Sequence, residues 1–263
     1  MDPVPAGAAA TLCRLRQDVA RIEGHETALD VGTPLLTLGV AAIDGALQGG
    51  LRPASLHEIA PQAARDAGAA TGFALALAAR AGRAAAETLW IQTDFAAAEV
   101  GALYGPGCAL FGLSARRLLV LTVRRPVDAL WAMEEALKSR ALGSIVAELP
   151  GDAPFADLTA TRRLAVAARG GESFAVLLRH RVSPLASAAQ TRWHVAALPG
   201  QPDRFGGLGR TALSLSLVKN RRGPTGRFLV AWDHHERAFS ALSLGVAAAA
   251  VDRPGRAPRR RAG

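Results

Sequence analysis

Apolar runs of strand length alternate with helical stretches along most of this sequence, and this alternation constrains the fold most. The helical stretches have apolar residues on one face or are rich in alanine, and the strand-length runs are typical of strands buried on both faces. Strands that alternate with helices predict βαβ crossovers, hence an α/β fold with a mainly parallel sheet and helices on both of its faces. The predicted strands are 55–59, 87–93, 118–123, 144–149 and 173–180, and the predicted helices are 40–47, 71–82, 126–142 and 158–169.

The pattern changes after Ser187, where TRWHVAAL, ALSLSLVKN and GRFLVAWD follow one another with no helix-length stretch between them. Because ALSLSLV alternates apolar and polar residues with period two, we expect antiparallel strands that close one edge of the sheet.

Three regions follow from these patterns: an arm over 1–30, one α/β domain over 31–250 and a basic tail over 251–263. The arm contains an amphipathic helix, and we expect its apolar face either to bind a partner or to pack on the domain itself. The apolar face consists of Leu12, Leu15, Val19 and Ile22.

Composition favours a globular protein with an anionic partner. Half of the 263 residues are hydrophobic and 20% are charged, and the formal net charge is +9. Five arginines and no acidic residue follow Asp252, among them Arg259, Arg260 and Arg261. Such a tail either contacts nucleic acid or is simply solvated.

The two cysteines, Cys13 and Cys108, show no metal-binding spacing and fit a reducing cytoplasm. The N-terminus lacks the basic and apolar regions of a signal peptide, and every alanine-rich stretch is interrupted by charge. We therefore expect a cytoplasmic protein without a membrane segment.

The loop after strand 55–59 stands where many α/β domains bind phosphate. A P-loop follows G-x-x-x-x-G-K-[ST], where lysine reaches the phosphates and Ser or Thr holds Mg²⁺. Here Gly68 is followed by Ala69 and Ala70, Arg65 lies on the wrong side of that glycine, and Asp66 adds negative charge where phosphate would sit. We interpret this as a degenerate P-loop and expect no cofactor, no metal, and neither tight nucleotide binding nor hydrolysis.

Two more residues belong to this degenerate nucleotide loop. Thr71 is predicted to be the N-cap of helix 71–82. Glu148 could polarise a water in a working NTPase, but without lysine and metal we expect a strand-end carboxylate with a local hydrogen bond.

Basic residues elsewhere suggest contacts with DNA or an acidic partner. Lys219, Arg221 and Arg222 form a basic turn, which is either a binding site or a solvated hairpin tip. Arg204 and Arg210 flank a glycine-rich loop that could contact DNA. By contrast, 233–236 (DHHE) is predicted to be a polar hairpin turn and not a metal site. The four tryptophans, Trp90, Trp131, Trp193 and Trp232, are all expected in the core.

Several segments, in the same order, resemble the RecA core. These are LTLGVAAIDGALQGGL, LHEIA, LYGPGCALFGLSARRLLVL, ALGSIVAELPGD and VKNR. ALGSIVAELPGD resembles the Walker B region, with Glu148 near the usual aspartate. VKNR resembles a strand end that reaches a neighbouring subunit's nucleotide. LYGPGC, LWAMEEALKS and TRWHV resemble the ImuA family, the RecA-like proteins of damage-induced mutagenesis, over about 35–232.

This resemblance implies a RecA-like fold and a non-enzymatic accessory role in SOS-induced, error-prone translesion synthesis. The implied partners are an ImuB-like relative of Y-family polymerases, an error-prone DNA polymerase III alpha-type subunit, RecA and single-stranded DNA; self-association is a further expectation. Two alternatives stay open: a SulA-like inhibitor of cell division, and a weak RecA-like ATPase that binds DNA.

Overall fold

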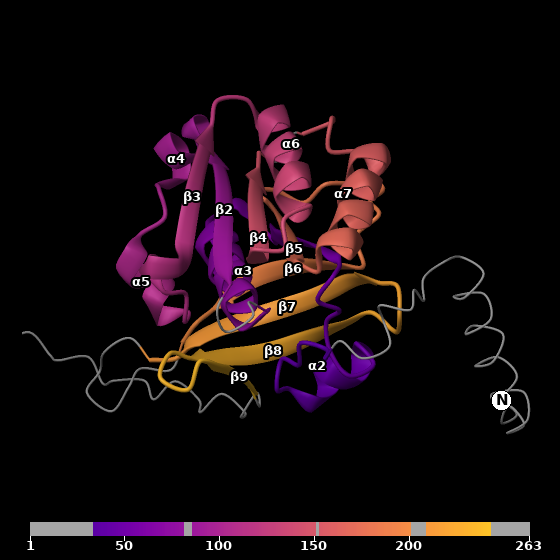
Figure 1. Ribbon diagram of the computed structural model, residues 1–263. Helices are drawn as coiled ribbons and strands as arrows, with labels where there is room; N and C mark the ends of the chain where they lie inside the picture. Colours follow the sequence, from indigo (N-terminus) through magenta and orange to yellow (C-terminus); the bar gives the residue numbers. More distant parts are fainter. Residues whose placement is uncertain (1–33, 82–85, 151–152, 201–208, 243–263) are drawn as a thin grey trace, which may run out of the picture.

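The computed structural model describes residues 34–81, 86–150, 153–200 and 209–242, and these form one twisted nine-stranded sheet (Figure 1). The strand order is β3-β2-β4-β5-β1-β6-β7-β8-β9. The first six strands in this order are parallel, and β7, β8 and β9 continue the sheet in antiparallel fashion. The strands are β1 (Leu56–Pro61), β2 (Glu87–Thr93), β3 (Leu118–Val123), β4 (Leu142–Leu149), β5 (Phe174–Arg179), β6 (Thr191–Leu198), β7 (Thr211–Asn220), β8 (Gly226–Asp233) and β9 (Ala238–Ala241).

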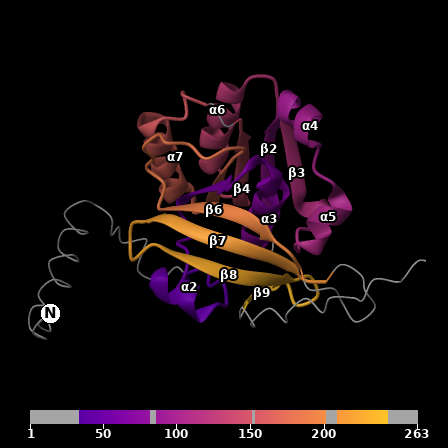
Figure 2. The same cartoon turned by 180° about the vertical axis from the view of Figure 1, so that it is seen from behind.

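Helices cover both faces of the parallel part, as the sequence predicts. Helix α3 packs on one face, and α6 and α7 lie side by side on the other (Figures 1 and 2). Successive residues of the central strands therefore join different cores: Val146 contributes to the α3 side, and Ile145 and Ala147 to the α6–α7 side. The helices are α2 (Ala41–Ala46), α3 (Ala67–Ala81), α4 (Asp94–Val100), α5 (Gly105–Leu110), α6 (Pro126–Leu137) and α7 (Leu158–Gly171), with short 3₁₀ turns η2 (Ala64–Asp66) and η3 (Ala115–Arg117).

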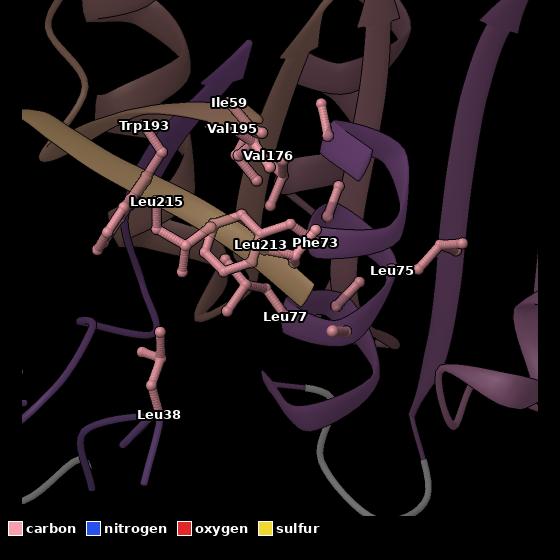
Figure 3. Packing of buried hydrophobic residues seen from close by; sticks show 14 of the residues in the cluster. Leu38, Ile59, Phe73, Leu75, Leu77, Val176, Trp193, Val195, Leu213 and Leu215 are labelled. Atoms are coloured by element: carbon pink, nitrogen blue, oxygen red, sulfur yellow. The ribbon is translucent and has the colours of Figure 1, made fainter. Parts of the chain in front are cut away.

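The larger core joins the two kinds of sheet around α3. Phe73 of α3 meets the ring of Trp193 at 5.6 Å and that of Phe239 at 5.7 Å. Figure 3 shows Phe73 and Leu77 of α3 beside residues of β5, β6 and β7. Because one helix packs on parallel and antiparallel strands together, the α3 side of the sheet has one continuous core.

Two expectations about the strands and helices are wrong in detail, and the prediction was incomplete. The segment TRWHVAAL forms β6, which runs parallel to β1. The antiparallel part of the sheet begins only with the pairing of β6 and β7. Helix α3 begins at Ala67, four residues before the predicted N-cap, because the alanine-rich segment continues helically back to the turn η2. Helices α4 and α5 were not predicted.

The tryptophan prediction holds for three of the four residues. Trp90, Trp193 and Trp232 are fully buried, whereas the side chain of Trp131 is 64% exposed. Trp131 follows Leu130, which faces the sheet from α6, so the next position of the helix turns about 100° away from the core.

Residues 234–237 form the turn between β8 and β9, and within the described ranges no group of His, Cys, Asp or Glu side chains could hold a metal ion. None of the helices in these ranges has both the length and the apolarity to span a bilayer.

Candidate functional site

A hollow of about 250 Å³ lies beside the start of α3, at the carboxyl ends of the central parallel strands. This is the edge where open α/β sheets bind their ligands. Gly68 and Thr71 line it from α3, and Glu148 and His180 line it from β4 and the end of β5. Gly68, Thr71 and Glu148 are thus brought together as predicted, whereas Arg65 is exposed and does not line the hollow.

Asp66 organises the loop that leads into the hollow. Its side chain is only 3% exposed, and its two oxygens accept hydrogen bonds from the backbone N–H groups of Ala63 and Ala197, each at 3.0 Å. The carboxylate therefore caps the turn η2 and ties the loop to β6. Our expectation that Asp66 stands where phosphate would sit is wrong, because both oxygens serve the fold and the residue does not line the hollow.

The beginning of α3 offers few of the groups that a P-loop supplies. Thr71 is not an N-cap, because it lies in the second turn of α3, although it does line the hollow. Ala69 follows Gly68 inside the helix, so the position expected for lysine carries a methyl group. The N-terminus of the helix itself still attracts an anion.

Glu148 is held by two side chains from the neighbouring strands. The Trp90 indole N–H donates to Glu148 Oε1 at 2.5 Å, and His180 Nε2 lies 3.2 Å from Oε2. The side chain is 6% exposed. The predicted hydrogen-bonded carboxylate is confirmed, but its partners come from β2 and the end of β5, far from it in sequence. Because each of its carboxylate oxygens has a hydrogen-bond partner, Glu148 links β4 to β2 and to the end of β5.

The basic turn between β7 and β8 is docked against α2. Asn220 donates from its side-chain amide to the carbonyl oxygens of Ala46, at 2.8 Å, and Pro224, at 3.0 Å. Arg222 is partly buried and donates to the carbonyl of Gln48 at 3.4 Å. The alternative of a fully solvated tip is therefore wrong, although the side chain of Arg221 is exposed.

Lys219 turns inward from this strand end. Its ammonium donates to the carbonyl oxygen of Ser187, and partial burial lowers its pKa to about 8, with the charges of Arg221 and Arg192 acting in the same direction. The opposing influence of Glu58, which raises this pKa, is the smaller one.

Glu58 is the acidic centre of a buried ion cluster near Lys219. It is 1% exposed and lies 3.2 Å from Nη2 of Arg179 and 2.6 Å from Nε of Arg192. The guanidinium of Arg192 also donates to the carbonyls of Leu185 and Ser183. One carboxylate thus pairs with two arginines, so the cluster keeps a net positive charge.

No protein-family model matches the chain. A curated relative, Protein ImuA of Caulobacter vibrioides, is 30% identical over 215 residues, which span 75% of this chain and 83% of that protein, and its counterpart in a second strain matches equally. The chain belongs to the ImuA family.

The fold of this ImuA-family chain is RecA-like. The crystal structure of the RadB recombinase superposes with a TM-score of 0.53 over 80% of this chain and 100% of that chain. Since only 14% of residues are identical, this likeness concerns the fold alone.

The other predicted binding residues of this ImuA-family chain are only partly described. Arg210 is exposed and pairs with Asp233 at 2.8 Å. The remaining ones lie outside the described residues: Arg204, the tail residues Arg259, Arg260 and Arg261, and the arm residues Leu12, Leu15, Val19 and Ile22.

Residues that were not singled out as site residues complete the hollow. Tyr104, Cys108 and Phe111, from α5 and its ends, line the side opposite α3. Burial raises the pKa of the Cys108 thiol. These residues belong to the LYGPGCALF segment, whose resemblance to the RecA core was the one signal of their importance.

Proposed function

We propose that this ImuA-family chain is a non-enzymatic accessory protein of damage-induced mutagenesis, which assembles other proteins at sites of error-prone DNA synthesis. The observation that carries the proposal is the state of the degenerate P-loop: Ala69 stands at the lysine position, and the carboxylates of Asp66 and Glu148 are both used by the fold. A loop without the P-loop lysine, and with Ala70 in place of the Ser or Thr that follows it, lacks two of the groups on which phosphoryl transfer depends. The fold then serves as a framework for contacts.

The partners in this proposal are an ImuB-like relative of Y-family polymerases and an error-prone DNA polymerase III alpha-type subunit, with RecA and single-stranded DNA as further contacts, all in the cytoplasm. The arm over 1–30 would bind protein, and the Arg-rich tail together with Arg221 would bind DNA. A pull-down with the ImuB-like protein tests the assembly role: we expect the full chain to capture it and a chain lacking 1–24 to capture less. Equal capture by both would contradict the role of the arm.

A nucleotide titration tests the non-enzymatic part against the rival ATPase. We expect no saturable heat when magnesium-ATP is added to the full chain at millimolar concentration. Thr71 and Glu148 line the hollow, but a non-enzymatic accessory protein needs no nucleotide there. Thr71→Ala and Glu148→Gln should therefore leave the frequency of damage-induced mutations unchanged in cells. Micromolar ATP affinity that Thr71→Ala abolishes, or ATP turnover that Glu148→Gln removes, would overturn the proposal.

A further inference from the structure

The hollow beside α3 has a largely apolar wall, although it stands where a P-loop would hold phosphate. Leu75 of α3 and Leu178 of β5 line it, and Leu103, Cys108 and Phe111 line it from α5 and the residues next to that helix. A phosphate group placed against such a wall would lose hydration without gaining partners, whereas an apolar ring would gain contacts. The wall therefore favours an apolar ring over a triphosphate.

The size of the hollow fits one large side chain. Sites for drug-sized ligands typically have volumes of about 300–1,000 Å³, whereas this hollow has a volume of about 250 Å³. Gly68 and Tyr104 both line it and are exposed, Tyr104 to 72%, so they form its mouth. A small apolar pocket that opens beside an exposed aromatic ring is typical of the places where a tyrosine or tryptophan side chain anchors a protein interface.

His180 gives this apolar hollow one available hydrogen-bond acceptor. Its Nε2 lies 3.2 Å from Oε2 of Glu148, and a carboxylate only accepts hydrogen bonds, so Nε2 carries the proton in this contact. In the neutral ring Nδ1 is then an acceptor. Among the described residues Nδ1 has no hydrogen-bond partner, and His180 is only partly buried. A ring that enters the hollow is therefore bound best if it carries a donor, as the phenol of tyrosine and the indole of tryptophan do.

We propose that the hollow binds a tyrosine or tryptophan side chain of a partner protein, with the ring between α3 and α5 and its O–H or N–H group donating to Nδ1 of His180. The chain's own ends do not supply this group, because 1–33 and 243–263 contain no Phe, Tyr or Trp. A second copy is disfavoured by the net charge of +9, since two such copies repel each other. This inference gives the proposed assembly role a contact site and rests on that role for its biological sense.

Peptide titrations of the full chain, labelled with ¹⁵N-glycine, test the proposal by NMR. The probes are Gly-Ser-Tyr-Ser-Gly and Gly-Ser-Phe-Ser-Gly, blocked at both ends, which differ only in the phenolic hydroxyl. We expect saturable shifts of the amide signals of the lining glycines Gly68, Gly101 and Gly107 at millimolar peptide, with the tyrosine peptide bound about two- to tenfold more tightly. In His180→Ala the two peptides should bind equally. No saturable shift with either peptide, or equal affinities in the original chain, would overturn the proposal.

A pair of matched glycine variants locates the site. Gly68 in α3 and Gly170 in α7 are both exposed helical glycines at which an added Cβ would have no neighbour within 4 Å. Gly68→Leu places a side chain at the mouth of the hollow and should weaken binding of the tyrosine peptide at least about tenfold, whereas Gly170→Leu should leave it unchanged.

Equal binding by these two glycine variants would contradict a site in the hollow. A dimer in light scattering that both Gly68→Leu and Trp131→Ala dissolve would assign the hollow to a second copy and overturn the proposal. The assay contains no DNA, ATP or polymerase, so the mutagenesis role and this inference can fail separately.

Discussion

Two glycines one helical turn apart in α3 have different surroundings. A Cβ atom added at Gly68 would have no neighbour within 4 Å, whereas one at Gly72 would lie 2.7 Å from the ring of Phe111. That ring is held in turn by stacking on Trp232, with the centroids 5.8 Å apart. The first glycine therefore leaves space that a P-loop would give to phosphate, and the second allows α5 to approach α3.

We predict opposite effects of alanine at these two positions. Gly68→Ala should raise the free energy of unfolding by about 0.5–1 kcal/mol, because alanine loses less backbone entropy in a helix. Gly72→Ala gains the same backbone-entropy benefit but displaces Phe111. We therefore expect it to lower the free energy of unfolding by about 1–3 kcal/mol. Urea unfolding of both variants measures the difference, and two stabilised variants would show that Phe111 can move at no cost.

His57 predicts a pH dependence of stability. The ring is fully buried, and burial lowers its pKa to about 4 from 6.5, while Nε2 lies 2.9 Å from the carbonyl of Arg52 and Nδ1 lies 2.8 Å from the hydroxyl of Thr191. Between these two pKa values the unfolded chain binds a proton that the folded chain does not. The free energy of unfolding should therefore fall as the pH drops from 6.5 to 4, by about 3 kcal/mol in all.

His57→Gln removes the titrating group and keeps a side chain that can both donate and accept. We expect this variant to be less stable at neutral pH but to lose much of the acid sensitivity in that window, as followed by urea unfolding at several pH values. The exposed His235, changed to Gln, serves as the control and should keep the acid sensitivity of the original chain. The same acid sensitivity in both variants would assign it to other groups.

Single residues show where sequence reasoning succeeds and fails. Glu148 was predicted to be a bound carboxylate because no lysine or metal ligand accompanied it, but its partners Trp90 and His180 come from other strands and leave no trace in local sequence. Asp66 was misjudged for the same reason, since Ala197 is 131 positions away. Trp131 is different: its position beside Leu130, off the apolar face of the helix, already indicates exposure.

At the scale of elements, a buried ion cluster ties three strands together. Glu58 of β1 pairs with Arg179 of β5 and with Arg192 of β6. Two nitrogens of Arg179, Nε and Nη1, have no hydrogen-bond partner within the described part of the chain, so this guanidinium depends on Glu58 for its charge balance.

We expect Glu58→Gln to lower the free energy of unfolding by about 3–5 kcal/mol, because it leaves buried arginines without an opposing charge. Glu134→Gln is the matched control, since Glu134 pairs with an arginine that is 64% exposed, Arg163, and should cost about 1 kcal/mol or less. Chemical unfolding compares the two. A similar, small cost in both would mean that the cluster relaxes or takes up water.

Elements are predicted well where one segment decides its own structure. The strands over 87–93 and 118–123 were predicted with the bounds that β2 and β3 have, because continuous apolar runs bounded by turns leave little choice. The direction of β6 was missed because it depends on a crossover over 180–190 that contains no helix. Nor does the apolar run of β3 reveal that it lies at the edge of the sheet.

At the scale of the whole molecule, charge is distributed unevenly. The net charge is +9, and the five arginines after Asp252 account for much of it. Within the described part, Lys219, Arg192 and Arg179 point their charges into the fold and contact backbone carbonyls or Glu58. Cations used in this way are less available to an external phosphate. We therefore expect the tail to contribute a large share of the proposed affinity for DNA.

This distribution predicts how DNA binding should respond to salt. Each phosphate contact with a single strand contributes about −0.7 to the slope of the logarithm of affinity against the logarithm of salt concentration. A chain in which the five tail arginines are changed to glutamine should therefore lose up to about 3.5 from that slope. Filter binding or anisotropy with a single-stranded oligonucleotide of mixed sequence measures it, and Arg221→Gln, which removes one exposed cation, should reduce the slope by about 0.7 at most. If the slope stays the same without the tail arginines, the tail does not contact DNA. Any DNA contact would then have to come from the body of the domain.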